Sequence, residues 1–277
     1  MSCPLVTAVL ALLVVLALFG ARQTGYFDRL SNQTLFPAPK PTYDETFPGL
    51  TVHTDSESKV KYAFVLIPPV PIDSEPYLVY FHGNNGDIGS VYQNLVELAS
   101  QTSTNVVAVE YPGYGVLHKQ SPTAKGINSA AQFALDYLIK RQVSPNKIVI
   151  YGWSIGTGPA TRLAKSAADR GLTLGGLILQ APYTSIHAIA SDRSYFGPYL
   201  IPNSWKNDVI LSKLQIPLLI IHGELDKNIG VSHGKRLYKL AKSENKRLII
   251  PPHMTHFNFD LAFDIIYPVR RFLRENL

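Results

Sequence analysis

The sequence predicts an α/β fold in which helices cover both faces of a mostly parallel sheet. Short runs that are apolar at nearly every position alternate with longer stretches of helical period. Strands that are apolar throughout are typical of a parallel sheet buried on both faces. Charged residues make up 17% of the 277 residues, below the roughly 25% of an average domain, which also fits such a buried sheet. A chain of this length can form one large domain of this class.

Strands and helices alternate from about residue 49 onward. The predicted strands span residues 49–53, 60–67, 77–81, 105–110, 147–151, 177–180, 217–222 and 247–250. The predicted helices span residues 91–100, 124–142, 158–168, 232–242 and 257–275. The first two strands are joined by a short polar turn, which suggests an antiparallel edge. Ligands of such sheets bind beyond the carboxyl ends of the strands, so functional residues are expected there.

The N-terminus holds an apolar stretch over residues 5–21 that carries no charged side chain. Its length lies at the short end of a membrane-spanning helix and just above a signal-peptide core. A signal peptide usually begins with positive residues, and none precedes this stretch. A retained transmembrane anchor over residues 1–21 is therefore preferred to a cleaved signal peptide, and a buried helix of the domain ranks third.

The sidedness of this anchor is left open by two opposing signals. Arg22, Arg29 and Lys40 follow the apolar stretch and nothing basic precedes it, which favours a cytoplasmic domain. The tripeptide Asn32-Gln33-Thr34 is a glycosylation sequon, which matters only on the lumenal side. Residues 22–48 hold four prolines and no sustained period, and are interpreted as a linker to a domain over residues 49–277.

Composition excludes several classes of site. Cys3 is the only cysteine, so the chain forms no internal disulfide and no cysteine-based zinc or iron–sulfur site. The net charge of +6 is a mild basic bias, and no nucleic-acid-binding motif accompanies it. Zinc-protease and phosphate-loop motifs do not occur. We therefore expect no cofactor, no metal and no nucleic-acid partner.

The strongest chemical motif is Gly152-Trp153-Ser154-Ile155-Gly156, which lies between a predicted strand and a predicted helix. This is the context of a nucleophile elbow, where two glycines allow a tight turn that exposes the serine hydroxyl. The backbone N–H of Ile155 lies in the first turn of the helix, where amides have no internal partner and the dipole favours negative charge. Ser154 is the predicted nucleophile.

A serine nucleophile needs a base and an acid, which follow it in that fold in the order serine, acid, histidine. His256 follows the last strand and immediately precedes the final helix, so it is the predicted base. His253, next to the stiff Pro252, is the reserve candidate. Asp226, in the loop after strand 217–222, is the predicted acid, with Glu224 as the alternative.

Three other histidines follow Ser154 and are given no catalytic role. His222 ends a strand and is interpreted as a structural residue at the rim of the sheet. His233 lies in a basic helical stretch and is expected to be solvated. His187 comes too early, before the strand that carries the acid.

An oxyanion hole needs a second N–H donor, which should come from the loop after strand 77–81. This loop reads His82-Gly83-Asn84-Asn85-Gly86-Asp87, and its glycines permit sharp turns. The backbone N–H groups of Asn84 and Ile155 are therefore the predicted oxyanion donors.

The segment between strands 177–180 and 217–222 is long enough for one core helix and a small lid at about residues 186–212. It is rich in aromatic residues and contains proline and glycine, which favours a loop or short turns. Tyr183, Phe196 and Trp205 are predicted to line a groove for a hydrophobic acyl group. An equally weighted alternative is that they pack the lid onto the sheet.

Four motifs recur in an order and spacing that resemble the α/β-hydrolase superfamily over roughly residues 50–277. They are His82-Gly83-Asn84, Tyr111-Pro112-Gly113-Tyr114-Gly115, Gly152-x-Ser154-Ile155-Gly156-Thr157 and His222-Gly223-x-x-Asp226. The nearest resemblance is to its membrane-anchored abhydrolase domain-containing branch, which includes protein depalmitoylases and lipid hydrolases. Trp153 departs from the smaller or polar residue common there. Phe257, where depalmitoylase-like members tend to have asparagine, and the lone Cys3 weaken the transfer of a substrate.

The motifs and the resemblance together imply a membrane-anchored serine hydrolase that acts on an ester or thioester. Its substrate would be a small molecule or an acylated protein, and it would need no cofactor. An aminopeptidase or amidase is the alternative within the enzymes, because the same three residues cleave amides. A non-catalytic binding protein of this fold is the alternative outside them, and the intact set of three residues argues against it.

Overall fold

The computed structural model describes residues 32, 34–69, 75–193 and 201–277. The predicted anchor over residues 1–21 lies outside this part of the chain, as does Phe196. Within the described residues, no helix has both the length and the apolar character needed to cross a membrane.

The centre of the fold is an eight-stranded sheet with the order β1-β2-β4-β3-β5-β6-β7-β8. Its strands are β1 (Leu50–Thr54), β2 (Lys61–Ile67), β3 (Tyr77–Phe81), β4 (Asn105–Glu110), β5 (Ile148–Trp153), β6 (Gly176–Gln180), β7 (Leu218–Ile221) and β8 (Lys246–Ile249). The β1–β2 and β2–β4 pairs are antiparallel, and all the other pairs are parallel. The mostly parallel sheet with an antiparallel edge is thus as predicted.

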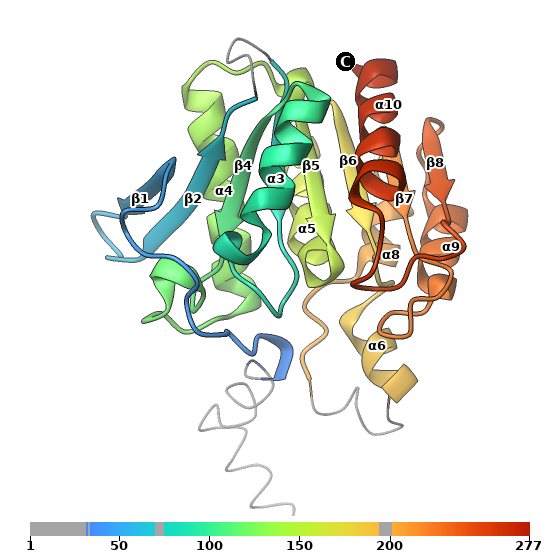
Figure 1. Ribbon diagram of the computed structural model, residues 1–277, viewed down its shortest axis with the longest axis horizontal. Coiled ribbons are helices and arrows are strands. Elements are labelled where there is room, and N and C mark those ends of the chain that lie inside the picture. Colours follow the sequence, from blue (N-terminus) through green and yellow to red (C-terminus); the bar gives the residue numbers. More distant parts are fainter. Residues whose placement is uncertain (1–31, 33, 70–74, 194–200) are drawn as a thin grey trace, which may run out of the picture.

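Helices cover both faces of this sheet (Figure 1). The helices of eight or more residues are α3 (Ile88–Thr102), α4 (Ala124–Lys140), α5 (Thr157–Asp169), α6 (Ile186–Arg193), α9 (Val231–Leu240) and α10 (Tyr267–Asn276). Three shorter helical elements also bear on the site: the 3-10 turn η3 (Ser154–Gly156), α8 (Asn207–Leu211) and the π-helical turn η4 (Leu261–Ile266). In Figure 1, α3 and α10 lie in front of the sheet, whereas α4 and α5 lie behind it.

Alternation along each strand produces two separate cores. On β5, Ile148 and Ile150 belong to the core under α4 and α5. Val149 and Tyr151 belong to the core under α3 and α10. Because successive side chains point to opposite faces, each strand supplies both layers, which explains why the strands are apolar at nearly every position.

Within the predicted linker, several side chains of residues 35–48 pack against the domain. Phe36 is 1% exposed and meets the ring of Trp205 edge-on, with 5.9 Å between the ring centroids. The Tyr43 hydroxyl donates to Glu110 Oε2 at 2.6 Å, and the Thr42 N–H donates to Asp87 Oδ2 at 2.7 Å. Single side chains fix this segment, so it has no repeating pattern that the sequence could reveal.

The final helical region begins at Leu261, four residues later than predicted. Asp260 caps it, accepting the N–H of Phe263 at 2.9 Å. Residues 257–260 form a loop that runs from His256 to this cap. The predicted small lid is described at its two ends only, where α6 and α8 lie. A backbone bridge between Ser185 and Lys206 closes the base of that segment.

Candidate active site

The turn after β5 is too crowded for any side chain at its two glycines. A Cβ atom at Gly152 would lie 2.4 Å from the carbonyl oxygen of Gly156, and one at Gly156 would lie 2.3 Å from that of Phe81. Ser154 between them adopts a φ of 56°, a conformation that costs energy in a residue other than glycine. This strained turn lifts Ser154 to the carboxyl edge of the sheet, directly ahead of α5.

Three predicted residues from distant parts of the chain meet at this edge. The Nε2 atom of His256 lies 2.9 Å from Ser154 Oγ, and its Nδ1 atom lies 2.7 Å from Asp226 Oδ2. Because the carboxylate accepts, Nδ1–H donates to Asp226 and Nε2 is left to accept the serine proton. All three residues are buried. A hydroxyl held against an imidazole that a carboxylate orients is an arrangement that can generate a nucleophile.

Asp226 is held ionised by its own loop. Its Oδ1 atom accepts the N–H groups of Asn228 at 2.8 Å and Ile229 at 2.9 Å. Burial alone would raise the pKa of Asp226, but the hydrogen bonds from His256 and from these N–H groups outweigh burial and lower the pKa below its ordinary value. The carboxylate is therefore charged at neutral pH and can hold the imidazole in one tautomer.

The reserve candidates do not join this group. Glu224 lies at the surface and pairs with Lys235, with 3.2 Å between Oε2 and Nζ. The His253 side chain is 65% exposed, and its Nε2 lies 3.0 Å from Oδ2 of the buried Asp264. Both contacts turn these side chains away from Ser154.

Two of the remaining histidines are buried. His222 donates Nε2–H to the carbonyl oxygen of Ile229 at 2.8 Å, which braces the loop that carries Asp226. Burial lowers the pKa of His222, so the neutral ring is favoured.

The prediction that His233 is solvated is wrong. Its Nδ1 contacts Thr184 Oγ1 at 3.0 Å and its Nε2 contacts Asp192 at 2.7 Å, which ties α9 to the start of the lid segment.

The loop after β3 lies against Ser154, where the sequence predicts the second oxyanion donor. A Cβ at Gly83 would lie 3.8 Å from that of Ser154. His82 donates Nδ1–H to the carbonyl oxygen of Gly83 at 2.7 Å, and its Nε2 contacts Glu110 at 2.9 Å. The backbone of Asn84 is held by its carbonyl oxygen, which accepts a hydrogen bond from the Tyr114 hydroxyl at 3.0 Å.

The same loop is also held by the N-terminal segment. The side-chain amide of Asn84 donates to the carbonyl oxygen of Leu35 at 3.2 Å. The Tyr43–Glu110 contact buttresses the carboxylate that binds His82. Residues 35–43 therefore support the loop that the sequence assigns to the oxyanion hole, although the sequence alone placed them in a linker.

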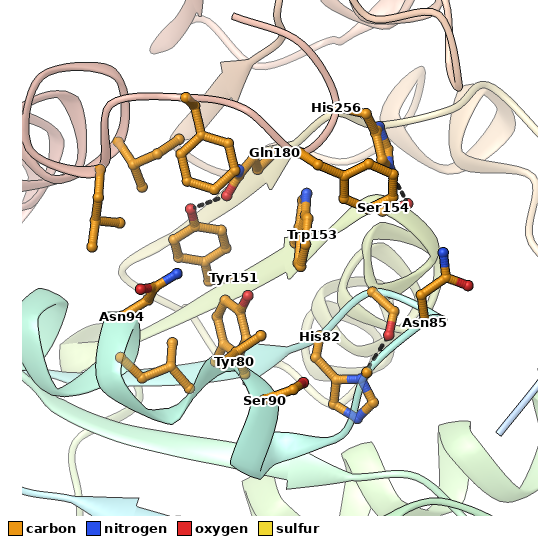
Figure 2. A pocket seen from close by; sticks show the side chains of 18 of the residues that line it. Tyr80, His82, Asn85, Ser90, Asn94, Tyr151, Trp153, Ser154, Gln180 and His256 are labelled. Atoms are coloured by element: carbon orange, nitrogen blue, oxygen red, sulfur yellow. Dashed lines mark hydrogen bonds between the residues drawn. The ribbon is translucent and has the colours of Figure 1, made fainter. Parts of the chain in front are cut away.

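A cavity of about 310 Å³ opens beside Ser154 and His256 (Figure 2). It lies on the α3 and α10 face of the sheet. Its apolar walls come from α3, from the loop after His256 and from η4, and include Leu95, Leu98, Phe257, Phe259, Leu261 and Ile265. Its polar surface includes Tyr80, Tyr151, Trp153 and Gln180, which end or nearly end three adjacent strands.

Two of the aromatic residues predicted to line an acyl groove, Tyr183 and Trp205, lie elsewhere. Tyr183 and Trp205 are almost fully buried in the core on the α4 and α5 face, away from this cavity. The Tyr183 hydroxyl donates to the carbonyl oxygen of Ile155 at 3.3 Å, and Trp205 Nε1 donates to Asn128 at 3.0 Å. Their role is to pack the lid segment against α5, because that segment crosses the face of the sheet opposite to the cavity.

The apolar walls of the cavity and the polar residues Tyr80, Tyr151 and Gln180 were missed by sequence reasoning, although one signal was available. Gln180 is a polar residue at the end of an otherwise apolar strand, and it is paired with Trp153 across β5 and β6. The walls from α3 and η4 are ordinary apolar helix positions without a distinguishing pattern. Among the described residues, no cluster of three or more histidine, cysteine or acidic side chains is arranged to hold a metal ion.

Comparisons with known proteins identify relatives of this chain. A family model described as a thioesterase domain matches residues 76–195. Lysophosphatidylserine lipase ABHD12 of Danio rerio is 33% identical over 184 residues, covering 61% of this chain and 48% of that protein, so the chain spans about half of its length. Protein bem46 of Schizosaccharomyces pombe is 30% identical over 210 residues, covering 74% of this chain and 69% of that protein.

Solved structures share the fold at low sequence identity. Est1E from Butyrivibrio proteoclasticus superposes with a TM-score of 0.64 at 19% identity, over 82% of this chain and 98% of that one. The Pyrococcus furiosus esterase Pf2001 gives a TM-score of 0.63 at 18% identity, over 86% and 98%. These likenesses establish the architecture into which the residues above are set.

Proposed function

The chain belongs to the α/β-hydrolase superfamily, and from this we propose that it is a serine hydrolase that cleaves a carboxylic ester or thioester. The observation that carries the proposal is the continuous line of hydrogen bonds from Asp226 through His256 to Ser154, beside an open cavity. This line is the arrangement that activates a serine for acyl transfer.

In the proposed mechanism Ser154 Oγ attacks the acyl carbonyl carbon and passes its proton to His256 Nε2. Asp226 stabilises the imidazolium, and the N–H groups of Asn84 and Ile155 bind the oxyanion. The tetrahedral intermediate expels the alcohol or thiol, which takes the proton from His256, and an acyl-enzyme remains on Ser154. Water then attacks the acyl carbon, gives a proton to His256 and releases the acid, and Ser154 regains its proton.

An ester or thioester is favoured over an amide by the relatives. The matching family model is a thioesterase domain, and the zebrafish relative is a lysophosphatidylserine lipase by name. The largely apolar walls of the cavity suit a hydrophobic acyl group, delivered on a small molecule or on an acylated protein. We further propose that residues 1–21 anchor the enzyme in a membrane, with the domain on the cytoplasmic side.

The test is the turnover of a ladder of acyl esters and thioesters by the full-length chain. Each buried methylene contributes on the order of 0.8 kcal/mol, so kcat/KM should rise from acetyl to about octanoyl and then level off when the cavity is full. Ser154→Ala should abolish turnover. Faster cleavage of peptides than of any ester would replace this assignment by an amidase. No turnover of either class would favour a binding protein.

A further inference from the structure

Four residues form the polar floor of the cavity: Tyr80, Tyr151, Trp153 and Gln180. Most of this floor lies behind Trp153, away from Ser154. Trp153 and Gln180 are register partners on β5 and β6. Tyr151 lies two residues deeper on the same face and pairs with Tyr80 on β3. In Figure 2 the indole of Trp153 stands between Ser154 and Tyr151, with its nitrogen on the side of Gln180. A substrate group that passes Trp153 from Ser154 therefore meets the Gln180 amide.

This floor presents two hydrogen-bond donors that have no acceptor among the described residues. They are Gln180 Nε2 and Trp153 Nε1, both buried atoms. The Tyr151 hydroxyl donates to Gln180 Oε1 at 2.6 Å, which orients the amide and leaves its nitrogen for another partner. Gln180 is 3% exposed and is one of the residues that line the cavity, so a further partner would approach it from the cavity. Buried donors are costly when unpaired, and an indole nitrogen can only donate.

The lack of charged side chains around this floor, in the part of the chain that the structure describes, indicates that the bound group is neutral. No lysine, arginine, aspartate or glutamate is found among the described residues that line the cavity. A carboxylate or phosphate group would lose its hydration there without a compensating cation, whereas a neutral oxygen would not. Burial raises the pKa of Tyr80 and Tyr151, so both phenols stay neutral and add no charge.

We propose that the space behind Trp153 is a substrate subsite that accepts a neutral, oxygen-bearing group, with its carbonyl, ether or hydroxyl oxygen bound by Gln180 Nε2 and Trp153 Nε1. The inference rests on the proposed function, because it takes the cavity to hold one arm of the ester or thioester. The preferred substrate is then an ester or thioester of a group that carries an oxygen remote from the scissile bond, and such a substrate should be cleaved faster than one with a plain hydrocarbon chain of the same length.

The size of the cavity selects a probe. Its volume of about 310 Å³ corresponds to roughly ten water molecules in the liquid, which suits a ligand such as acetophenone. A matched probe is α-methylstyrene, which has nearly the same shape but a methylene group in place of the carbonyl oxygen. The chain has two tryptophans, so a full-length sample labelled with ¹⁵N-tryptophan gives two indole signals that Trp153→Phe assigns.

Acetophenone should shift the Trp153 indole signal until the site is saturated. It should also bind at least about fivefold more tightly than α-methylstyrene, because the ketone oxygen gains one or two hydrogen bonds. Gln180→Met keeps the length of the side chain but removes its donor, and should reduce that preference to less than twofold. The matched control is Gln132→Met on α4, where the amide contacts Asp136 and Ser166 instead of the cavity. This control should keep the preference.

Three results would overturn the proposal. They are equal affinity for the two probes, a Trp153 signal that saturating acetophenone leaves in place, or an equal loss of preference in Gln132→Met. If Gln180→Met does not fold, Trp153→Phe provides the second test, read by calorimetric affinities of the two probes, and an undiminished preference would count against the subsite. Binding is measured without turnover, so a failure of the hydrolase assignment would show in the ester assay alone.

Discussion

His256 and His253 are three positions apart, yet their surroundings give them different roles. His256 lies between Ser154 and Asp226, whereas His253 is exposed and contacts Asp264. Residues of such a triad act as a unit, so His256→Ala should lower kcat by about a thousandfold or more. His253→Ala should change kcat by less than about threefold. Steady-state kinetics on a soluble ester compares the two, and the reverse order would reassign the base.

The buried His222 makes the free energy of unfolding depend on pH, and the sign of this dependence follows from its pKa shift. Burial lowers the pKa of His222 in the folded state, whereas the unfolded chain has an ordinary value of about 6.5. The folded state then binds fewer protons than the unfolded state between these two values. Its contribution to stability is complete above about pH 6.5 and is lost as the pH falls toward the folded pKa.

The prediction is that the free energy of unfolding falls more steeply between about pH 7.5 and pH 5.5 in the wild type than in His222→Gln. Urea denaturation at a series of pH values measures both slopes. The titration of Asp226 does not affect the two slopes in this pH range. Its lowered pKa contributes stability that is present above the unfolded value of about 3.9 and is lost only at more acidic pH. Parallel profiles for the two proteins would exclude His222 as the source.

At the scale of elements, the N-terminal segment is part of the domain that carries the site. Phe36 is buried against Trp205, and the next residue toward the N-terminus, Leu35, accepts from Asn84. Phe36→Ala should lower the free energy of unfolding by about 3–5 kcal/mol, as for other large-to-small changes in a core. Thermal denaturation of the full-length chain measures the loss.

The control is Val52→Ala on the edge strand β1, where the side chain is 43% exposed. A change at such a position should cost about 0.5–1 kcal/mol or less. Equal destabilisation by the two substitutions would show that residues 35–48 add little to the domain.

The sheet could be predicted closely because its signal is local. A parallel strand buried on both faces is apolar at each position, so β3 and β4 begin and end at the predicted residues. The elbow at Ser154 could also be predicted from a local signal, because the tight turn requires glycines between a strand and a helix. Chain order placed the acid and the base after the last two strands. Distance from the strand end favoured Asp226 over Glu224, and the position just before the final helix favoured His256 over His253.

What the sequence does not reveal depends on which face of the sheet a distant segment covers. The aromatic residues Tyr183 and Trp205 pack on the α5 face, whereas the cavity lies on the α3 face, and no local pattern distinguishes the two. His233 was expected in water because its neighbours in the sequence are basic. The helix turns it inward to Thr184, a contact made through the tertiary fold.

At the scale of the whole molecule, the described chain enters the domain at the edge that carries the site. Leu35 contacts Asn84 there, next to the elbow. The proposed anchor over residues 1–21 precedes this edge in the chain, which would suit a lipid or an acylated membrane protein as the substrate. Figure 1 shows the described N-terminal residues at the end of the sheet toward which the arrows of the parallel strands β3 to β8 point.

The anchor predicts that the full-length chain stays in the membrane pellet after extraction with alkaline carbonate, because a spanning helix does not depend on ionic contacts. Mass spectrometry of the recovered protein should show residues 5–21 still attached. A chain recovered in the supernatant and lacking those residues would establish a cleaved signal peptide in place of the anchor.

The central claim, that Ser154 is a nucleophile activated by His256 and Asp226, is tested most directly by covalent labelling. The full-length chain is treated with a fluorophosphonate, and intact mass and peptide mapping locate the adduct. We expect one adduct per chain on Ser154, no adduct on Ser154→Ala, and labelling of His256→Ala slowed by orders of magnitude. An unlabelled wild-type chain, or an adduct that persists on another residue of Ser154→Ala at the same rate, would contradict it.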